Sequence, residues 1–346
     1  MLAESTFSLI ALPLGFVSTV LLTYVLMRAG RRKGVLDIPN ERSSHTAPVP
    51  RGGGLAIIII FFVFLYVYPS AVDRPIGVPV WKSLLLGGAI IAVIGIFDDL
   101  RHISARWRFL VHLLAAVVAL SLLSALPDIP IFGFSLDLGM FGYVFFAISL
   151  VWFVNLFNFM DGIDGIAGVE AITVLGSAAL ILFVQDQVAW LTLLSYLAVC
   201  VAGFLVWNWP PAKVFMGDVC SGFLGFTLGL LAVVTSVETT LNVWVWVILC
   251  GVFLVDATTT LIRRIGRGET WYEAHRSHAY QILSRRFGSH WKVSVSVLVV
   301  NIAWLLPLGL LAAEYPFWAL PICCIALLPL LILAVRVGAG KREIPY

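Results

Sequence analysis

The sequence predicts an all-α integral membrane protein with about eleven transmembrane helices. Of its 346 residues, 61% are hydrophobic and only 12% are charged, and the mean hydropathy is +1.01. A water-soluble globular domain does not carry that much apolar surface. Apolar runs of roughly 17 to 25 residues, the length that crosses a bilayer core, recur from residue 7 to about residue 335. The sequence lacks the alternating pattern of a membrane β-barrel.

Each predicted span is an apolar run bounded by polar or turn-forming residues. The spans are 7–27, 54–68, 83–97, 109–126, 140–157, 168–185, 188–206, 219–235, 243–262, 293–313 and 316–335. The first run is too long for a cleaved signal peptide and no basic residue precedes it, so we expect a permanent span. We expect residues 1–346 to form a single membrane domain. The five cysteines show no metal-ligand spacing and no disulfide framework.

The distribution of Lys and Arg predicts the orientation. With the N-terminus placed in the periplasm, the only basic residues in the outside segments are Arg74 and Lys82, out of 22 Lys and Arg in the chain. This is a strong positive-inside bias. An odd number of spans then leaves the C-terminus in the cytoplasm. The net charge of +3 follows from this topology, so it does not indicate nucleic-acid binding.

The polar residues of unusual type gather in the predicted cytoplasmic loops. These loops are 28–53, 98–108, 158–167, 207–218 and 263–292. The outside connections are short and carry no such clusters. A carrier or channel places polar groups near the middle of the bilayer along its pathway. The one-sided distribution therefore favours an active site on the cytoplasmic face.

Two adjacent aspartates, Asp98 and Asp99 in GIFDDL, stand where the third span reaches the cytoplasm. Acids at a helix C-terminus oppose the helix dipole, and they have no part in setting the topology. Adjacent carboxylates suit a general base or the binding of a phosphate-bound metal. Two solvated acids near Arg101 would explain the same residues, and the sequence leaves both interpretations open.

The stretch NLFNFMDGIDGIAG, residues 155–168, contains two asparagines and two aspartates but no Lys or Arg. If the fifth span stays helical to its end, Asn155, Asn158 and Asp161 fall on one side of the helix. The glycines that follow end the helix and let backbone approach a ligand. Amide and carboxylate oxygens suit Mg²⁺ or Mn²⁺. The alternative is a polar turn between two spans.

The loop NWPPAKVFMGDVCSG offers Asn208, Lys213, Phe215 and Asp218 within a few residues. Its prolines and glycines are ordinary in a loop that joins two membrane helices. A lysine, an aromatic ring and an aspartate together could pair with phosphate, stack on a base and hold a metal.

The longest polar segment, 263–292, contains His275, Arg276 and His278. The histidines, three residues apart, could bind a metal or an anion. Glu273 is the only carboxylate or thiol beside them at metal spacing, so the sequence favours an anion. The apolar residues that follow repeat at helical spacing beside basic residues, which predicts an amphipathic helix at the membrane interface.

Further polar residues give weaker signals. A basic linker before the second span could be structural, or its glycines could bind an anion; it contains Asn40, Arg42, His45, Arg51 and Gly52 to Gly54. Within the spans we expect Asp256 to bind a neighbouring helix, His112 to be a hydrogen-bonded bundle residue, and Glu170 to cap the sixth helix.

Acids, amides, a lysine, arginines and histidines on one face describe a site for a metal-bound diphosphate, with an aromatic ring available for stacking. Apolar helices beside such a site give access to a lipid. Together they favour phosphoryl transfer between a soluble nucleotide and a membrane lipid, since metal, cations and carboxylates each have a part in that chemistry.

Four motifs in this order resemble those of the polyprenyl-phosphate N-acetylhexosamine-1-phosphate transferase family. They are DD at 98–99, NxxNxMDGIDGIAG at 155–168, NxPPAKVFMGD at 208–218 and HRSH at 275–278. The resemblance runs from about residue 40 to residue 290. It implies a multi-pass protein of the bacterial inner membrane that needs Mg²⁺ or Mn²⁺. The implied reaction joins the HexNAc-1-phosphate of a UDP-HexNAc to undecaprenyl phosphate and releases UMP.

The resemblance also implies a role for each candidate residue. Asp98 would deprotonate or orient the lipid phosphate with the support of Asp99, and Asn158 and Asp218 would bind the metal. The expected contacts to the UDP-sugar are Asn155, Asp161, Asn208, Lys213, Phe215, His275, Arg276 and His278. Of these, Asp161 and Phe215 would contact the uracil. Asn208, His275, Arg276 and His278 would contact the diphosphate and the sugar.

The HRSH motif departs from the consecutive histidines of the peptidoglycan enzyme in that family. This departure favours initiation of O-antigen or another surface polysaccharide, with UDP-GlcNAc or a 6-deoxy relative (UDP-FucNAc or UDP-QuiNAc) as donor. The sequence leaves open direct attack by the lipid phosphate and a covalent aspartyl intermediate, of which we favour direct attack. Relatives suggest a homodimer. The alternative function is a secondary transporter with carboxylate ion coupling, which needs ionisable groups halfway across the bilayer.

Overall fold

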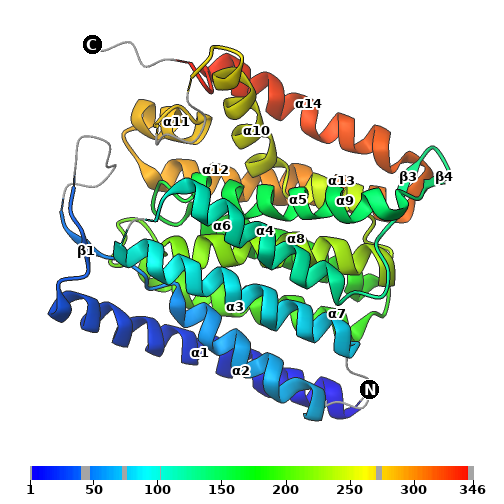
Figure 1. The fold of residues 1–346 in the computed structure, drawn as a ribbon, viewed down its shortest axis with the longest axis horizontal. Coiled ribbons are helices and arrows are strands. Elements are labelled where there is room, and N and C mark those ends of the chain that lie inside the picture. The colour runs from blue at the N-terminus through cyan, green and yellow to red at the C-terminus, as the bar shows by residue number, and fades with distance from the viewer. Residues whose placement is uncertain (1, 40–46, 72–75, 102, 270–274, 342–346) are drawn as a thin grey trace.

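The protein is a bundle of helices that lie side by side, as the computed structural model shows (Figure 1). The structure describes residues 2–39, 47–71, 76–101, 103–269 and 275–341. The expected all-α class is confirmed, since the only strands in these ranges form two small antiparallel sheets. One sheet joins β1 (Leu36–Asp37) to β2 (Val49–Pro50), and the other joins β3 (Ile129–Ile131) to β4 (Phe134–Leu136).

The helices follow one another with short connections. The first eight are α1 (Leu2–Lys33), α2 (Leu55–Ala71), α3 (Val78–Arg101), α4 (Ala105–Ser121), α5 (Gly139–Met160), α6 (Ile166–Val184), α7 (Val188–Asn208) and α8 (Asp218–Glu238). The others are α9 (Val243–Leu249), α10 (Gly251–Ile265), α11 (Ala279–Phe287), α12 (His290–Val300), the π-helix η1 (Asn301–Leu305), α13 (Leu306–Glu314), the 3₁₀ turn η2 (Pro316–Trp318) and α14 (Ala319–Val337).

The number of membrane spans differs from the prediction. Among the described residues, 8 helices are long and apolar enough to cross a membrane, or 9 if the bent pair α9 and α10 counts as one span. Every predicted span falls on a helix, but α2 and α4 have only 17 residues each. The structure confirms a multi-pass membrane protein. The count of eleven spans and the predicted orientation are not confirmed.

The predicted span 243–262 is not one straight helix. It is broken at Cys250, where α9 and α10 meet at 81°. The sequence contains no proline at the break. A Cβ atom at Gly251 would lie 2.8 Å from Leu327 of α14, so the backbone at the break packs directly against a neighbouring helix. The bend turns α10 away from the bundle direction (Figure 1).

Helix α8 lies at the centre of the bundle, where it packs against α3 and α5. In its apolar window 89% of the residues are buried, compared with 22% in the outer helices α1 and α14. Glycines make the close packing possible. A Cβ at Gly95 of α3 would overlap the backbone of Val219, and a Cβ at Gly225 of α8 would overlap the carbonyl of Phe153.

The loops that carry the polar motifs lie at one end of the bundle. Figure 1 shows β1 and α11 at its left end and the hairpin of β3 and β4 at its right end. Helix α1 begins at the right end and α14 ends at the left.

Candidate active site at the polar end of the bundle

Two loops far apart in the sequence are joined here by backbone hydrogen bonds. The amide of Gly53 donates to the carbonyl of Phe215 at 3.0 Å, and the amide of Gly54 donates to that of Met216 at 3.1 Å. A Cβ at Gly54 would overlap the side chain of Cys220. The glycines before α2 therefore serve a close backbone approach, which brings Arg51 to the start of α8.

Asp99 holds the N-terminus of α8. Its carboxylate accepts the backbone amides of Asp218 at 2.9 Å and Val219 at 3.1 Å, which satisfies two of the amides that a helix start leaves unpaired. The Arg51 guanidinium bridges the two acids, with Nε 2.9 Å from Asp99 and Nη2 3.0 Å from Asp218. Asp99 therefore positions Asp218 and shares its counter-charge.

Asn158, in the last turn of α5, reaches the other oxygen of Asp218. Its Nδ2 lies 2.8 Å from Asp218 Oδ1 and 3.2 Å from the hydroxyl of Ser221. The two residues expected to bind a metal, 60 positions apart in the chain, are thus in direct contact.

Asp98 is not a solvated acid, because only 6% of it is exposed. One carboxylate oxygen accepts the backbone amide of Ile103 at 2.7 Å, and the other pairs with Arg108 Nη1 at 2.6 Å. Both contacts come from the turn and the helix that follow α3. Asp98 thereby fixes the guanidinium of Arg108 beside the other acids.

A small cavity of about 20 Å³ connects these groups. Its polar lining comes from α3, α4, α5 and α8: Asp98, Arg108, His112, Asn155, Asn158 and Asp218. His112 was expected to be a hydrogen-bonded bundle residue, but its buried Nδ1 finds no partner in the described part of the chain. Asn155 lines the cavity while its amide donates to the carbonyl of Val151 in its own helix at 2.7 Å.

Asp161 ends α5 at the edge of this cluster. In the ranges that the structure describes, its carboxylate makes no hydrogen bond or ion pair. Burial raises the pKa of Asp161 well above its ordinary value, and the Asp218 carboxylate raises this pKa further. Asp99, Asp161 and Asp218 thus lie near the guanidinium of Arg51. An added cation would lower the repulsion among these three acids.

The DGIDG and FMGD loops are held together by side chains that the sequence assigned to a ligand or left uncertain. Asn208 is only 3% exposed. Its amide accepts from the amide of Gly165 at 3.0 Å and donates to the carbonyl of Val214 at 2.9 Å. Asp164 accepts from the amide of Ala212 at 3.1 Å. Asn208 therefore has both ends of its amide engaged in fixing loops.

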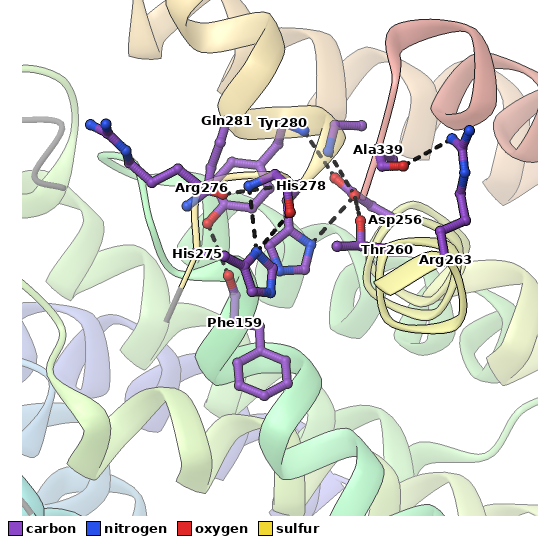
Figure 2. A network of polar contacts seen from close by, with 12 residues as sticks. Phe159, Asp256, Thr260, Arg263, His275, Arg276, His278, Tyr280, Gln281 and Ala339 are labelled. Atoms are coloured by element: carbon purple, nitrogen blue, oxygen red, sulfur yellow. Dashed lines mark hydrogen bonds and ion pairs between the residues drawn. The ribbon is translucent and has the colours of Figure 1, made fainter. Parts of the chain in front are cut away.

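The HRSH segment lies over the end of α5 (Figure 2). The rings of His275 and His278 stack with centroids 4.8 Å apart. Burial lowers the pKa of His275 to about 3, helped by the charges of His278 and Arg264. His275 is therefore neutral near pH 7, so the group is less cationic than the sequence suggested. Figure 2 shows Arg276 extending away from the two imidazoles.

A larger cavity of about 630 Å³ opens next to this segment. Its polar lining includes Asp164, Arg276, Gln281, Arg285 and His290. This volume lies within the range of pockets that hold cofactor-sized ligands, roughly 300–1,000 Å³. The walls of this cavity include two arginines as well as prolines and glycines. The two arginines suit a large polar ligand with negative charge.

Two predicted contact residues lie at the margin of the site. The exposed ammonium group of Lys213 sits over the ring of Trp207, 5.3 Å from the centroid. Phe215 is held through its backbone by the glycine segment before α2. Both lie on the loop that leads into Asp218.

Sequence reasoning missed Arg108 altogether and treated Arg51 only as part of a linker. A signal for Arg51 is its position directly before three glycines, which mark a close approach of backbone. No spacing rule pairs Arg108 with Asp98, because the contact depends on the turn between α3 and α4. Ser221 follows Asp218 by three residues, so it shares its helix face.

The part of the chain that carries this cluster matches a known family. The sequence model of glycosyl transferase family 4 matches residues 81–236, from α3 to the end of α8. This segment is similar to glycosyl transferase family 4. The match, together with the relatives that follow, supports a membrane-bound phospho-sugar transferase, and the resemblance predicted from the motifs is confirmed. The HRSH segment lies beyond the matched range.

Similar proteins match this chain over most of its length. A probable undecaprenyl-phosphate N-acetylglucosaminyl 1-phosphate transferase of Bacillus subtilis is 29% identical over 293 residues, 84% of this chain and 80% of the relative. A phospho-N-acetylmuramoyl-pentapeptide-transferase of Streptococcus thermophilus is 27% identical, with 90% of this chain and 97% of the relative covered. An undecaprenyl-phosphate alpha-N-acetylglucosaminyl 1-phosphate transferase of Thermotoga maritima is 27% identical, with 88% of this chain and 92% of the relative covered.

Proposed function

We propose that this chain transfers GlcNAc-1-phosphate from UDP-GlcNAc to undecaprenyl phosphate and releases UMP. The observation that carries the proposal is the meeting of Asp98, Asn158 and Asp218 around one cavity, with Arg51 and Arg108 as their cations. Two of the relatives described above are named for this activity. A 6-deoxy donor such as UDP-FucNAc or UDP-QuiNAc fits the same chemistry, as does a role in initiating O-antigen or another surface polysaccharide.

The lipid phosphate fits best beside Arg108. That guanidinium is held by Asp98, and the cavity they share opens toward Asn158 and Asp218. An oxygen of the lipid phosphate attacks the β-phosphorus of the donor, the bond from that phosphorus to the bridging oxygen breaks, and UMP leaves. The chain mainly supplies positioning and charge neutralisation.

The contacts of Asp98 favour direct attack over a covalent aspartyl intermediate. Both of its oxygens are engaged, by Ile103 and by Arg108, which makes them weaker nucleophiles than an oxygen of the lipid phosphate. Asp98 then acts by orienting Arg108 toward the acceptor phosphate. A radiolabelled acyl-phosphate trapped on Asp98 or Asp218 in the absence of lipid would contradict this mechanism.

The residues present fit a divalent cation. The facing atoms of Asn158 and Asp218 are 2.8 Å apart, and two neighbouring ligands at about 2.1 Å from Mg²⁺ have a similar separation. Turning the Asn158 amide over would present its oxygen to the same space. Within the described ranges no group of three or more His, Cys, Asp or Glu lies at metal spacing. Substrate phosphates and water would complete the shell, as Mg²⁺ prefers.

When bound there, Mg²⁺ or Mn²⁺ would neutralise phosphate charge. The chain's own contribution is to hold Asp218 at the start of α8 through Asp99 and to hold Arg51 between the two acids. The donor would occupy the cavity of about 630 Å³. Its diphosphate would then lie between that cavity and the metal ligands, with Asp161 and Phe215 toward the uracil.

The transporter alternative has less support. It would couple ions through Asp98, Asp161 or Asp218, and it needs ionisable groups halfway across the bilayer. The sequence offers only Asp256 and His112 at that depth. Asp256 instead binds the start of α11, and His112 lines the cavity that contains Asp98 and Asp218.

Purified protein supplied with undecaprenyl phosphate, Mg²⁺ or Mn²⁺ and a panel of UDP-HexNAc donors should release UMP from the correct donor. The lipid product should carry the sugar through a diphosphate. Absence of UMP with every donor and both metals would overturn the proposal. The same preparation, cross-linked in membranes, tests the predicted homodimer.

A further inference from the structure

A buried carboxylate outside the metal cluster holds the HRSH segment in place. Asp256 of α10 is 5% exposed. It accepts the backbone amides of Ala279 at 2.8 Å and Tyr280 at 2.9 Å, which are the first two residues of α11. The hydroxyl of Thr260, one turn further along α10, donates to the same carboxylate at 3.2 Å. Asp256 therefore fixes where α11 begins.

The same carboxylate also faces the last histidine of the motif. His278 Nδ1 lies 3.5 Å from Asp256 Oδ1, and the His278 side chain is 4% exposed. The carboxylate of Asp256 thus faces the edge of the ring that carries Nδ1 and fixes the orientation of the imidazole. The other ring nitrogen, Nε2, is then left for contact with a ligand.

The orientation of His278 in turn limits that of His275. Their rings stack with centroids 4.8 Å apart, and the carboxylate lies on the far side of His278 (Figure 2). Tyr280, whose amide Asp256 accepts, reaches the end of α5 through its hydroxyl, which donates to the carbonyl of Phe159 at 2.9 Å. Thus one buried acid sets both the ring pair and the contact of α11 with α5.

We propose that Asp256 is a positioning residue for the transfer reaction, which orients His278, and through it His275, toward the diphosphate of the UDP-sugar donor. This inference rests on the proposed function. Asp256 does not touch substrate; it acts through the imidazole that does. The predicted metal ligands lie in the other cluster, so the binding of the lipid acceptor does not depend on Asp256.

The test begins with Asp256→Asn and Asp256→Glu in the full-length protein. The asparagine keeps one acceptor oxygen but loses the charge and turns an amide N–H toward the amides of α11. We expect Asp256→Asn to lower kcat/KM for the UDP-sugar about tenfold or more, with KM for undecaprenyl phosphate unchanged. Asp256→Glu keeps the charge and should recover part of the loss.

A double variant separates positioning from general stability. If Asp256 acts through His278, the variant Asp256→Asn with His278→Gln should be no slower than His278→Gln alone. A merely structural role would multiply the two losses. Thr260→Val is the matched control, because it removes a hydrogen bond from the same carboxylate without touching α11; its kcat/KM should stay within about twofold of wild type.

The outcomes distinguish this inference from the proposed function. Release of UMP by the wild-type protein establishes the activity before any variant is measured. If wild type is active and folded Asp256→Asn has unchanged kcat/KM for the donor, or if the two losses multiply, the positioning role is wrong. If wild type releases no UMP with any donor, the proposed function itself fails.

Discussion

Asp99 and Asp256 do the same structural task at two places and serve different chemistry. Each is a buried acid on one helix that accepts the first two backbone amides of another, α8 for Asp99 and α11 for Asp256. Asp99 shares Arg51 with Asp218. Within the residues that the structure describes, the basic partner of Asp256 is the imidazole of His278. The first cap therefore lies in a charged cluster, and the second in a nearly neutral one.

The helices that they hold also differ. Helix α8 has 21 residues and is mostly buried, so packing would keep it in place without its cap. Helix α11 has 9 residues at the surface of the bundle. An N-terminal cap contributes about 0.5–2 kcal/mol, a small share for α8 and a large one for α11. Loss of the Asp99 carboxylate should mainly change the charge of the cluster around Asp218. Loss of the Asp256 carboxylate should mainly change the position of α11.

The largest effect is expected at the charged cluster. Asp218→Asn removes the carboxylate that Arg51, Asn158 and Asp99 surround. We expect UMP release to fall about tenfold or more, or to require correspondingly more metal. A titration with Mg²⁺ and Mn²⁺ at saturating substrates measures this. Glu170→Gln is the control, since Glu170 is a fully buried acid whose carboxylate binds Asn301; equal losses would mean that the metal is misplaced.

Removing the shared cation should come next. Arg51→Gln leaves Asp99 and Asp218 facing each other without a counter-charge. A buried polar group that loses its partner costs about 1–3 kcal/mol, and a charged group costs more. We expect a lower Tm in detergent and a loss of turnover smaller than that of Asp218→Asn. Added Mg²⁺ should raise the Tm of the variant more than that of wild type, because the ion supplies the missing charge. A Tm that is equal in both proteins at every Mg²⁺ concentration would contradict the bridging role of Arg51.

A steric variant tests the second region without changing any charge. Gly162→Ala would place a methyl group against the Tyr280 hydroxyl, which must shift for the two to fit. We expect kcat/KM for the donor to fall by severalfold, roughly threefold to tenfold, while the metal requirement stays the same. Gly176→Ala is matched, because a Cβ there meets nothing within 4 Å. If both variants behave alike, α11 does not need its contact with α5.

The smallest effect is expected at Lys213. Its ammonium group lies over Trp207 in an exposed position, and such a contact contributes about 0.5–1 kcal/mol. Lys213→Ala should therefore change donor kcat/KM by about threefold or less. A loss as large as that of Asp218→Asn would show that Lys213 reaches the diphosphate, as its place in the motif suggested.

Motifs in the sequence predicted the helical class and the clustering of polar residues at one end, because apolar run length and residue type are local properties. The pairing of Asn158 with Asp218 was predicted by the resemblance. The role of Asn208 was not predicted, because the sequence does not distinguish an asparagine that binds a ligand from one that joins two loops. The contacts of Arg51, Arg108 and Asp256 depend on how the loops fold, so the sequence did not identify them.

The count of eleven spans is not confirmed for a related reason. Apolar runs were counted as spans at 54–68 and 109–126, but the helices there, α2 and α4, have only 17 residues each. Hydropathy alone also cannot distinguish a straight helix from the bent pair α9 and α10, where Gly251 packs against α14. That bend is what carries Asp256 to the start of α11. The sequence suggested a neighbouring helix as its partner, and the structure shows which one.

The backbone bonds between Gly53, Gly54 and the 215–216 carbonyls have a consequence for substitutions at position 215. Because main-chain atoms alone make this link, a mutation that changes the side chain at position 215 leaves the link to Asp218 intact. The position that we propose to contact the base can therefore change its side chain without moving Asp218, the proposed metal ligand.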